Sequence, residues 1–194
     1  LKAVDSQTIE LFPFISKNCQ IAMFILKANP WLFRCKPQKI LKFFPNINTM
    51  HVDFLTNFEA TDTLPDTVTA IVVWRVGVGL FSWSQCKYND RVVEIDNLFC
   101  RDNERVDLRA FPRLERLGLQ SLPAIQFGHK LKKVKILLEE EVVPSKYFFF
   151  EWADQVVLVL RTEETFLKTK QHPFPPHVHI FCSDIGESVA PEDF

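Results

Sequence analysis

The sequence contains little glycine, almost no net charge and no long apolar run. Its 194 residues include five glycines and carry a formal net charge of −1. So little glycine excludes collagen-like and glycine-rich low-complexity chains. The balanced charge leaves no overall field that would draw the chain to nucleic acid or to an anionic membrane. The longest apolar stretch, residues 19–33, contains Lys27, Asn29 and Pro30 and is too short to span a bilayer. We therefore expect no membrane association.

The cysteines form no pattern typical of a metal site or a disulfide framework. The chain has five, an odd number, and no two of them are arranged as C-x-x-C. A scattered set of this kind is typical of reduced thiols, which predicts an intracellular protein, cytoplasmic or nuclear. We interpret these cysteines as small buried hydrophobic residues. They are Cys19, Cys35, Cys86, Cys100 and Cys182.

Motifs for catalysis and nucleotide binding are also missing. The segment 77–79 lacks the third glycine and the Lys-Ser/Thr pair of a phosphate-binding loop, and no G-x-S-x-G nucleophile turn occurs. The three consecutive glutamates at 139–141 alternate between the two faces of an extended segment, so they cannot converge on one ligand. We therefore expect no enzymatic activity, no cofactor and no small-molecule substrate.

Histidines near the C-terminus are the best candidates for metal chemistry. His177 and His179 are two residues apart, so they share a face if this segment is a strand. Two histidines on one face are suitable ligands for Zn²⁺. A third ligand would come from His172 in the preceding turn. A pair of exposed strand histidines explains the same pattern more simply, and we expect no metal site.

The sequence does contain an internal repeat. It is 47% hydrophobic and has 19 phenylalanines and 12 prolines, enough apolar bulk for a core. Segments 44–52 and 111–119 both read F-P-x-φ-x-x-φ-x-φ, where φ is an apolar residue. Related patterns begin near Leu64, His129 and Phe174, and two weaker ones lie around residues 92–97 and 153–158. Period-two alternation in each unit predicts a short strand with one buried side.

The spacing of these units is nearly constant. Their middle apolar positions are separated by 21, 24, 22, 17, 22 and 22 residues, close to the 20–29-residue period of leucine-rich repeats. In such repeats each turn contributes one short strand, and stacked neighbours bury the inner row. The middle positions are Met50, Ile71, Ile95, Leu117, Val134, Val156 and Val178.

Residues 45–184 therefore resemble the leucine-rich-repeat family in an irregular, intracellular form. The resemblance implies an α/β solenoid with a parallel sheet of about seven short strands. At the place where the family motif carries Asn or Cys, Cys100 alone conforms, and the 17-residue step is too short for a helix. This degeneracy is similar to the repeat regions of F-box proteins. That likeness implies a partner recruited for ubiquitination and, with a chain that opens at Leu1 without Met, a place within a larger protein.

Residues 1–44 are expected to form a helical N-terminal cap. Ser6 is suited to cap a short helix that ends near Pro13, and Asn18 to cap a second one that ends at residues 29–30. The spacing of Ile21, Phe24 and Ile25 is helical, and Pro37 suits the first turn of a third helix. An additional edge strand over residues 21–25 is the alternative.

Later segments are expected to complete the outer layer and the C-terminus. Helices are predicted over residues 145–152 and 162–169, with Phe148, Phe149, Phe166 and Leu167 turned inward. Residues 185–194 are polar and acidic and are expected to form a tail.

The outward positions of the predicted strands indicate where a partner would bind, because partners of solenoids dock on the concave face. The last outward column has five large apolar residues of seven, on a face that is expected to be wet. We therefore predict a non-catalytic scaffold that recognises a protein or peptide, with Trp74 and Phe181 as anchors. Coverage of the column by a loop or by the C-terminal tail is the alternative. The column is Asp53, Trp74, Leu98, Gln120, Leu137, Val159 and Phe181.

A basic stripe on the fourth and fifth units supports a second interpretation. Arg116, Lys133 and Lys135 are expected to orient a protein partner. Together with further basic residues they can instead follow the phosphates of a nucleic acid, so a nucleic-acid-binding module is the alternative function. Glutamates at 115 and 139–141 interrupt the stripe and favour the protein partner. The further basic residues are Arg113, Lys130 and Lys132.

Overall fold

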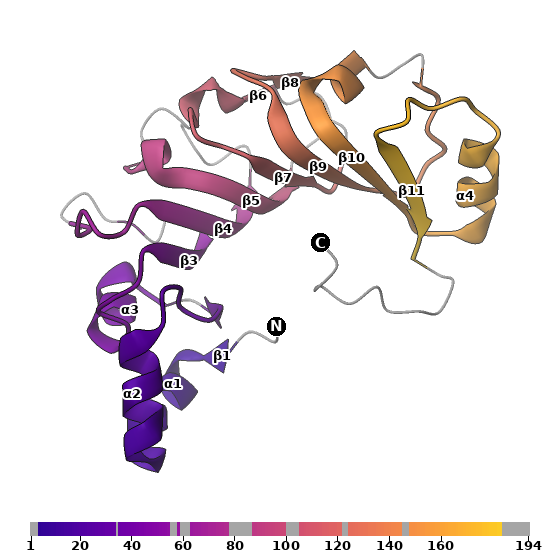
Figure 1. Cartoon of the computed structure of the whole chain (residues 1–194). Helices are drawn as coiled ribbons and strands as arrows, with labels where there is room; N and C mark the ends of the chain where they lie inside the picture. Colours follow the sequence, from indigo (N-terminus) through magenta and orange to yellow (C-terminus); the bar gives the residue numbers. More distant parts are fainter. Residues whose placement is uncertain are drawn as a thin grey trace.

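The computed structural model describes residues 4–33, 35–54, 58, 63–77, 87–99, 105–121, 124–144 and 148–183. The largest element is a seven-stranded sheet in which every strand is parallel to its neighbours and lies next to the preceding strand of the sheet. The sheet bends, and the helices, turns and short strands described between its strands lie on its outer side (Figure 1). The strands are β3 (Thr49–Phe54), β4 (Ala70–Gly77), β5 (Val92–Phe99), β7 (Arg116–Leu119), β9 (Leu131–Leu138), β10 (Ala153–Leu160) and β11 (Val178–Cys182).

The expected α/β class, with about seven parallel strands and helices before them, is confirmed. One row of buried apolar residues crosses the whole sheet, each paired in register with the next. The prediction placed Met50 and Ile71 at the start of this row, and that alignment is wrong by two residues. Val73, not Ile71, pairs with Ile95, which makes the longest step 22 residues. The observed row is Val52, Val73, Ile95, Leu117, Val134, Val156 and Val178.

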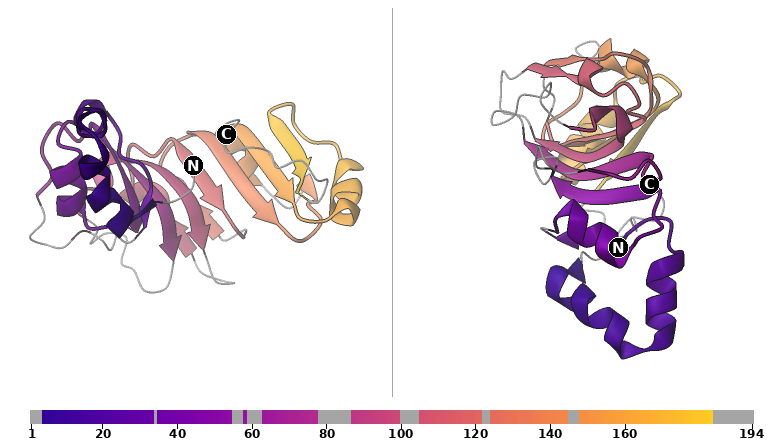
Figure 2. Two further views of the ribbon diagram at one scale, coloured as in Figure 1. Left: turned by 90° about the horizontal axis from the view of Figure 1, so that it is seen from below. Right: turned by 90° about the vertical axis from the view of Figure 1, so that its left-hand side faces the viewer.

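The core lies between this sheet and the connecting segments. The connections contain the strands β6 (Arg105–Asp107) and β8 (Ala124–Gln126), which pair with each other in parallel, the 3-10 turns η3 (Asn89–Arg91), η4 (Leu108–Ala110) and η6 (Phe148–Trp152), and the helix α4 (Glu163–Lys170). Figure 2 shows the strands side by side with α4 near one end of the sheet. Apolar residues of both layers form one buried cluster.

The two outer helices that the sequence predicts are found only in part. Helix α4 begins after Thr162, whose hydroxyl accepts the Thr165 N–H at 3.2 Å, but the segment expected from residue 145 is the shorter 3-10 turn η6, and residues 145–147 lie outside the described part. Phe166 packs against the core, whereas Leu167 is 53% exposed, so its predicted inward orientation is wrong. The side chains of Phe148 and Phe149 lie outside the described part. The spacing of α4 turns Thr169 inward instead.

Three helices precede the sheet, as expected: α1 (Ser6–Ile15), α2 (Lys17–Ile25) and α3 (Pro37–Phe43). Two strands of two residues each, β1 (Val4–Asp5) before α1 and β2 (Leu32–Phe33) between α2 and α3, pair with each other in parallel. The edge strand considered for residues 21–25 is wrong, because these residues are helical. Ser16, not Asn18, caps α2, by accepting the Cys19 N–H at 3.2 Å. No helix in the described ranges is long and apolar enough to cross a membrane.

The segment after α2 closes the first edge of the large sheet. Ala28 forms a parallel bridge with Thr49 of β3, and the Lys27 carbonyl accepts the Thr49 N–H at 3.0 Å. Asn29 continues the contact with its side chain: its Oδ1 accepts the His51 N–H and its Nδ2 donates to the His51 carbonyl, both at 2.9 Å. The main chain of β3 at His51 is thereby paired on this side.

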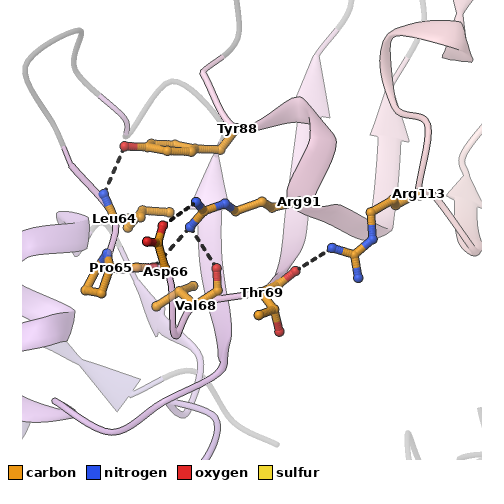
Figure 3. A network of polar contacts seen from close by, with 8 residues as sticks. All are labelled: Leu64, Pro65, Asp66, Val68, Thr69, Tyr88, Arg91 and Arg113. Atoms are coloured by element: carbon orange, nitrogen blue, oxygen red, sulfur yellow. Dashed lines mark hydrogen bonds and ion pairs between the residues drawn. The ribbon is translucent and has the colours of Figure 1, made fainter.

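Two arginine side chains link the segment before β4 to the segments before β5 and β7, at the N-terminal ends of these strands (Figure 3). Nη1 of Arg91, just before β5, donates to the carbonyls of Pro65 and Val68, at 3.0 and 2.9 Å, in the turn before β4. Nη1 of Arg113, before β7, donates to the Thr69 carbonyl at 2.9 Å. The Pro65 carbonyl also accepts the Val68 N–H of its own turn at 3.0 Å, so Arg91 adds a second hydrogen bond there and fixes the turn to the segment before β5.

Candidate partner-binding face

We call the side of the seven-stranded sheet opposite the core its open face. The sequence-predicted column maps onto this face only in part. Trp74, Gln120, Leu137 and Val159 are half-buried there, and Phe181 is 39% exposed. Asp53, by contrast, is buried. The predicted column is therefore not continuous across the sheet.

Leu98 is the predicted site residue that the structure contradicts. It is 0% exposed and belongs to the core. The cause is an irregularity in β5, where Ile95 pairs with Leu117 and Leu98 pairs with Leu119, so that β5 uses one more residue than β7. An extra residue of this kind is a β-bulge, and it reverses which side chains beyond it face the core. Simple alternation therefore placed Leu98 on the wrong face.

The bulge also explains a glycine. Gly118 lies on the open face of β7, and a Cβ atom there would overlap the main-chain carbonyl of Asp96 in the bulge. In register, Gly118 pairs with Lys135 of β9. The absence of a side chain at Gly118 thus lets the bulged backbone of β5 lie against β7.

A hydrogen-bonded polar chain occupies the centre of the open face. Gln120 Nε2 donates to Asn97 Oδ1 at 3.0 Å, and Asn97 Nδ2 donates to Asp96 Oδ2 at 3.1 Å. Burial raises the pKa of the Asp96 carboxyl, while the charge of Lys135 and the hydrogen bond from Asn97 act in the opposite direction. Gln120, predicted as part of an apolar binding column, instead fixes the bulge.

Cationic side chains lie beside this hydrogen-bonded row of polar side chains. Arg116 Nη1 lies 3.1 Å from Glu94 Oε2, and Arg116 is paired in register with Lys133. Burial is the main cause that lowers the pKa of the Lys133 amine; the charges of Lys135 and Arg116 lower it further, and Glu94 raises it. The three cations predicted to orient a partner therefore lie close enough to repel one another, with acidic groups between them.

The remaining members of the predicted basic stripe are engaged elsewhere. Lys130 pairs with Asp154 at 2.7 Å, and Lys132 pairs with Glu115 at 2.8 Å. Arg113 donates to a carbonyl of the turn before β4. Only half of the predicted stripe is thus left on the open face.

Aromatic rings cover the first strands of the open face. Trp31, from the segment between α2 and α3, lies against His51, with ring centroids 4.8 Å apart, and against Trp74, at 6.2 Å. The guanidinium of Arg75 stands 4.4 Å from the centroid of the Trp74 ring. Val72 beneath them is buried although it lies outside the core cluster. The predicted anchor Trp74 is therefore one member of a packed group.

The sequence analysis missed Trp31 and the state of His51. The Asn29-Pro30 pair predicts only the end of a helix, and the tryptophan that follows it is the local signal for this contact. Burial lowers the pKa of the His51 imidazole, and His51 Nδ1 has no hydrogen-bond partner within the described ranges.

A second apolar surface lies at the other end of the open face. Leu137, Val159 and Phe181 are side by side in register on β9, β10 and β11, and all three retain some exposure. Val157 next to them is buried without belonging to the core cluster. We call Leu137, Val159 and Phe181 the C-terminal apolar patch.

Helices α1 and α2 carry several exposed apolar residues. Phe14 is 83% exposed, and Ile21, Phe24 and Ile25 are exposed as well, whereas Met23 is buried. The predicted helical conformation of Ile21, Phe24 and Ile25 is confirmed, and Ile9 and Met23 make the contacts with the core.

The three histidines considered for zinc bind protein groups or lie exposed. His172 Nε2 is 2.8 Å from Glu141 Oε1, and His177 Nε2 is 2.9 Å from the Phe150 carbonyl oxygen. His179 is exposed on β11. In the part of the chain that the structure describes, no three His, Cys, Asp or Glu side chains are grouped as metal ligands.

Three of the five cysteines can be placed. Cys35 is buried, and Cys19 and Cys182 are half-buried; all three are free thiols. Burial raises the pKa of the Cys35 thiol, with smaller and opposed effects of Lys39 and Glu10. Cys86 and Cys100 lie outside the described residues.

No protein-family model, curated protein or solved structure matches this chain.

Proposed function

We propose that this chain is a non-catalytic recognition module that binds a protein or peptide partner on its open face. We also infer an irregular leucine-rich-repeat solenoid within a larger protein. Two observations support the architecture: the strands follow one another in chain order, and the parts of the connections that the structure describes share one side of the sheet. The free thiols are in keeping with an intracellular protein, cytoplasmic or nuclear.

The C-terminal apolar patch is the observation that carries the proposed function. Its three residues come from three adjacent strands and form a row on the side of the sheet away from the core. Apolar side chains that stay partly exposed in a contiguous row are typical of interaction surfaces. Trp74, held by Trp31, is a rigid second anchor at the other end of the face.

The charged centre of the open face determines how a bound partner is oriented on it. Arg116, Lys133 and Lys135 stand between the two apolar ends, next to Glu94 and Asp96. A peptide with apolar residues at its ends and an acidic residue between them fits this order of surfaces. Charge complementarity of this kind contributes register and association rate more than affinity.

The test is affinity capture with the purified chain, washed at low and high salt with and without nuclease. The captured protein is then purified and its affinity measured for the wild type, Leu137→Gln, Trp74→Ala and the control Leu167→Gln on α4. We expect tenfold or larger losses, about 1.4 kcal/mol, for the two open-face variants and none for the control. Equal affinity of all four proteins would refute the open-face site.

The same capture distinguishes the nucleic-acid alternative. Arg116→Glu combined with Lys133→Glu removes two cations from the open face. Binding to nucleic acid weakens steeply with salt because phosphate contacts release counterions. Retention that disappears with nuclease, and that this double variant abolishes at low salt, would replace the proposed protein partner with a nucleic acid.

A further inference from the structure

The two edges of the large sheet are finished differently. At the β3 edge, Ala28 bridges Thr49 and the Asn29 side chain pairs with the His51 main chain. At the other edge, β11 pairs with β10 and with no other strand of the described residues. An unpaired edge presents a row of main-chain donors and acceptors, which is a template for a further strand.

The hydrogen bonds of β11 identify which groups point outward. The Val156 N–H donates to the His177 carbonyl, and the Ser183 N–H donates to the Leu160 carbonyl. Main-chain groups alternate in direction along a strand. The odd-numbered residues of β11 therefore face β10, and the N–H and C=O groups of Ile180 and Cys182 point away from the sheet. Within the described ranges neither residue has a hydrogen bond on that side.

Strand β11 lacks three of the features that protect exposed edges, namely a charged Lys, Asp or Glu, a proline and a bulge. Its five residues, VHIFC, include no lysine, no acidic residue and no proline, and its pairing with β10 runs without a bulge. Phe181, the fourth of the five residues of β11, is 39% exposed. Natural sheet edges are commonly blunted by a charge, a proline or a bulge, so this strand is suited to pairing.

We infer that β11 pairs antiparallel with β11 of a second copy of this chain, in the register that places Phe181 opposite Phe181 of the second copy. In that register Ile180 lies opposite Cys182 of the second copy, and each such pair exchanges both of its main-chain hydrogen bonds. The two-fold axis repeats the exchange, so every outward group of Ile180 and Cys182 in both chains is used.

The same register explains why the occupant is a second copy. The donors and acceptors of β11 are complementary to themselves about Phe181, as a two-fold interface requires. Directly opposed residues on one face of an antiparallel pair have Cβ atoms about 4.5–5.5 Å apart, so the two Phe181 rings are in contact. Such a pairing buries a small area, which predicts a weak dimer with a Kd of about 10–100 µM.

The register is tested by disulfide trapping in a Cys182→Ser background. Phe181→Cys should form an intermolecular disulfide under mild oxidation, because opposed Cα atoms at non-hydrogen-bonded sites are about 4.5 Å apart, within the range of a disulfide. His179→Cys in the same background is the control, since its opposite residue is Ser183 of the second copy. Peptide mapping identifies the linked cysteines. Failure of the Phe181→Cys link, or equal linkage of both variants, would overturn the register.

Self-association is measured on the purified chain alone, so this result is independent of any protein partner on the open face. Sedimentation velocity from about 1 to 300 µM should show a concentration-dependent dimer for the wild type. Phe181→Lys should be monomeric throughout, because a lysine on an edge opposes pairing. Leu167→Lys, an exposed apolar position on α4, should dimerise like the wild type. A monomeric wild type, or a dimer that Phe181→Lys leaves intact, would overturn the inference; circular dichroism checks that each variant is folded.

Discussion

The side-chain amide of Asn29 takes the place of a main-chain peptide beside His51. Both hydrogen bonds of the amide, to the N–H and the C=O of His51, are 2.9 Å long, and Asn29 is 2% exposed. A third hydrogen bond, from Nδ2 to the Pro30 carbonyl, holds the amide in this orientation. One side chain thus completes the edge of a seven-stranded sheet.

Replacing Asn29 with alanine should lower the free energy of unfolding by about 2–4 kcal/mol, because the N–H and C=O of His51 lose their partners in a partly buried place. Urea unfolding followed by circular dichroism measures the loss. Asn46→Ala is the matched control: Asn46 is exposed and donates one hydrogen bond, to the Phe24 carbonyl, so its loss should stay below about 1 kcal/mol. Similar losses for both variants would contradict the edge-closing role.

Gly118→Ala should be among the most damaging small substitutions in the chain. The added methyl would meet the Asp96 carbonyl, which is main chain and cannot rotate away. We expect a loss of at least about 2 kcal/mol in the free energy of unfolding. At Gly128 an added Cβ would lie 3.1 Å from Arg109 Cα, a tight but adjustable approach, so Gly128→Ala should cost less. The bulge interpretation fails if the two substitutions have the same effect.

Leu98→Ala and Leu137→Ala test the corrected assignment of the open face. Leu98 is enclosed in the core, so its truncation should cost about 2–5 kcal/mol. Leu137 is half-buried on the open face, and its truncation should cost less than half as much. Thermal and urea unfolding measure both. A destabilisation by Leu137→Ala as large as that by Leu98→Ala would mean that Leu137 is core as well.

The strand pattern was predictable because apolar alternation is a local property. Each strand buries one row of Val, Ile or Leu, and the register of five of the six strand pairs follows from the repeat alignment. The β4–β5 pair was shifted because Ile71 and Val73 are equally apolar, so the pattern alone does not choose between them. A shift of two residues leaves each side chain on the same face of the strand. The prediction of which β4 residues point outward is therefore unaffected by this error.

The parts of the site that were not predictable depend on contacts between distant segments. The bulge at Asp96 and Asn97 moves Leu98 into the core and needs the bare backbone of Gly118 on the next strand. Trp31 reaches the open face from a segment before the first strand of the sheet. Neither relationship has a signature within a window of a few residues.

His51 should make the protein less stable in mild acid. Burial holds the pKa of His51 below its ordinary value, so the unfolded chain takes up a proton more readily than the folded one. Stability is therefore retained above the unfolded pKa of about 6.5 and is lost as the pH falls through that value toward the folded pKa.

The measurement is the melting temperature of the wild type and two variants between about pH 8 and pH 5. His51→Gln should weaken the decline in the acid range, because it removes the group whose protonation favours unfolding. His179→Gln, at an exposed histidine on β11, should decline like the wild type. A His51→Gln protein with an unchanged pH profile would show that other groups cause the acid sensitivity.

Folding of this chain does not require its two ends to meet. Each strand of the large sheet pairs only with the sheet strands that adjoin it in chain order, and the paired residues are 17 to 22 positions apart. Contacts of such limited sequence separation lower the entropic cost of the folding transition state and favour rapid folding. They also allow one end to open while the rest stays intact. Amide hydrogen exchange should accordingly be slowest in β5, β7 and β9 and fastest in β11, which gives the sheet a gradient of local stability along its length.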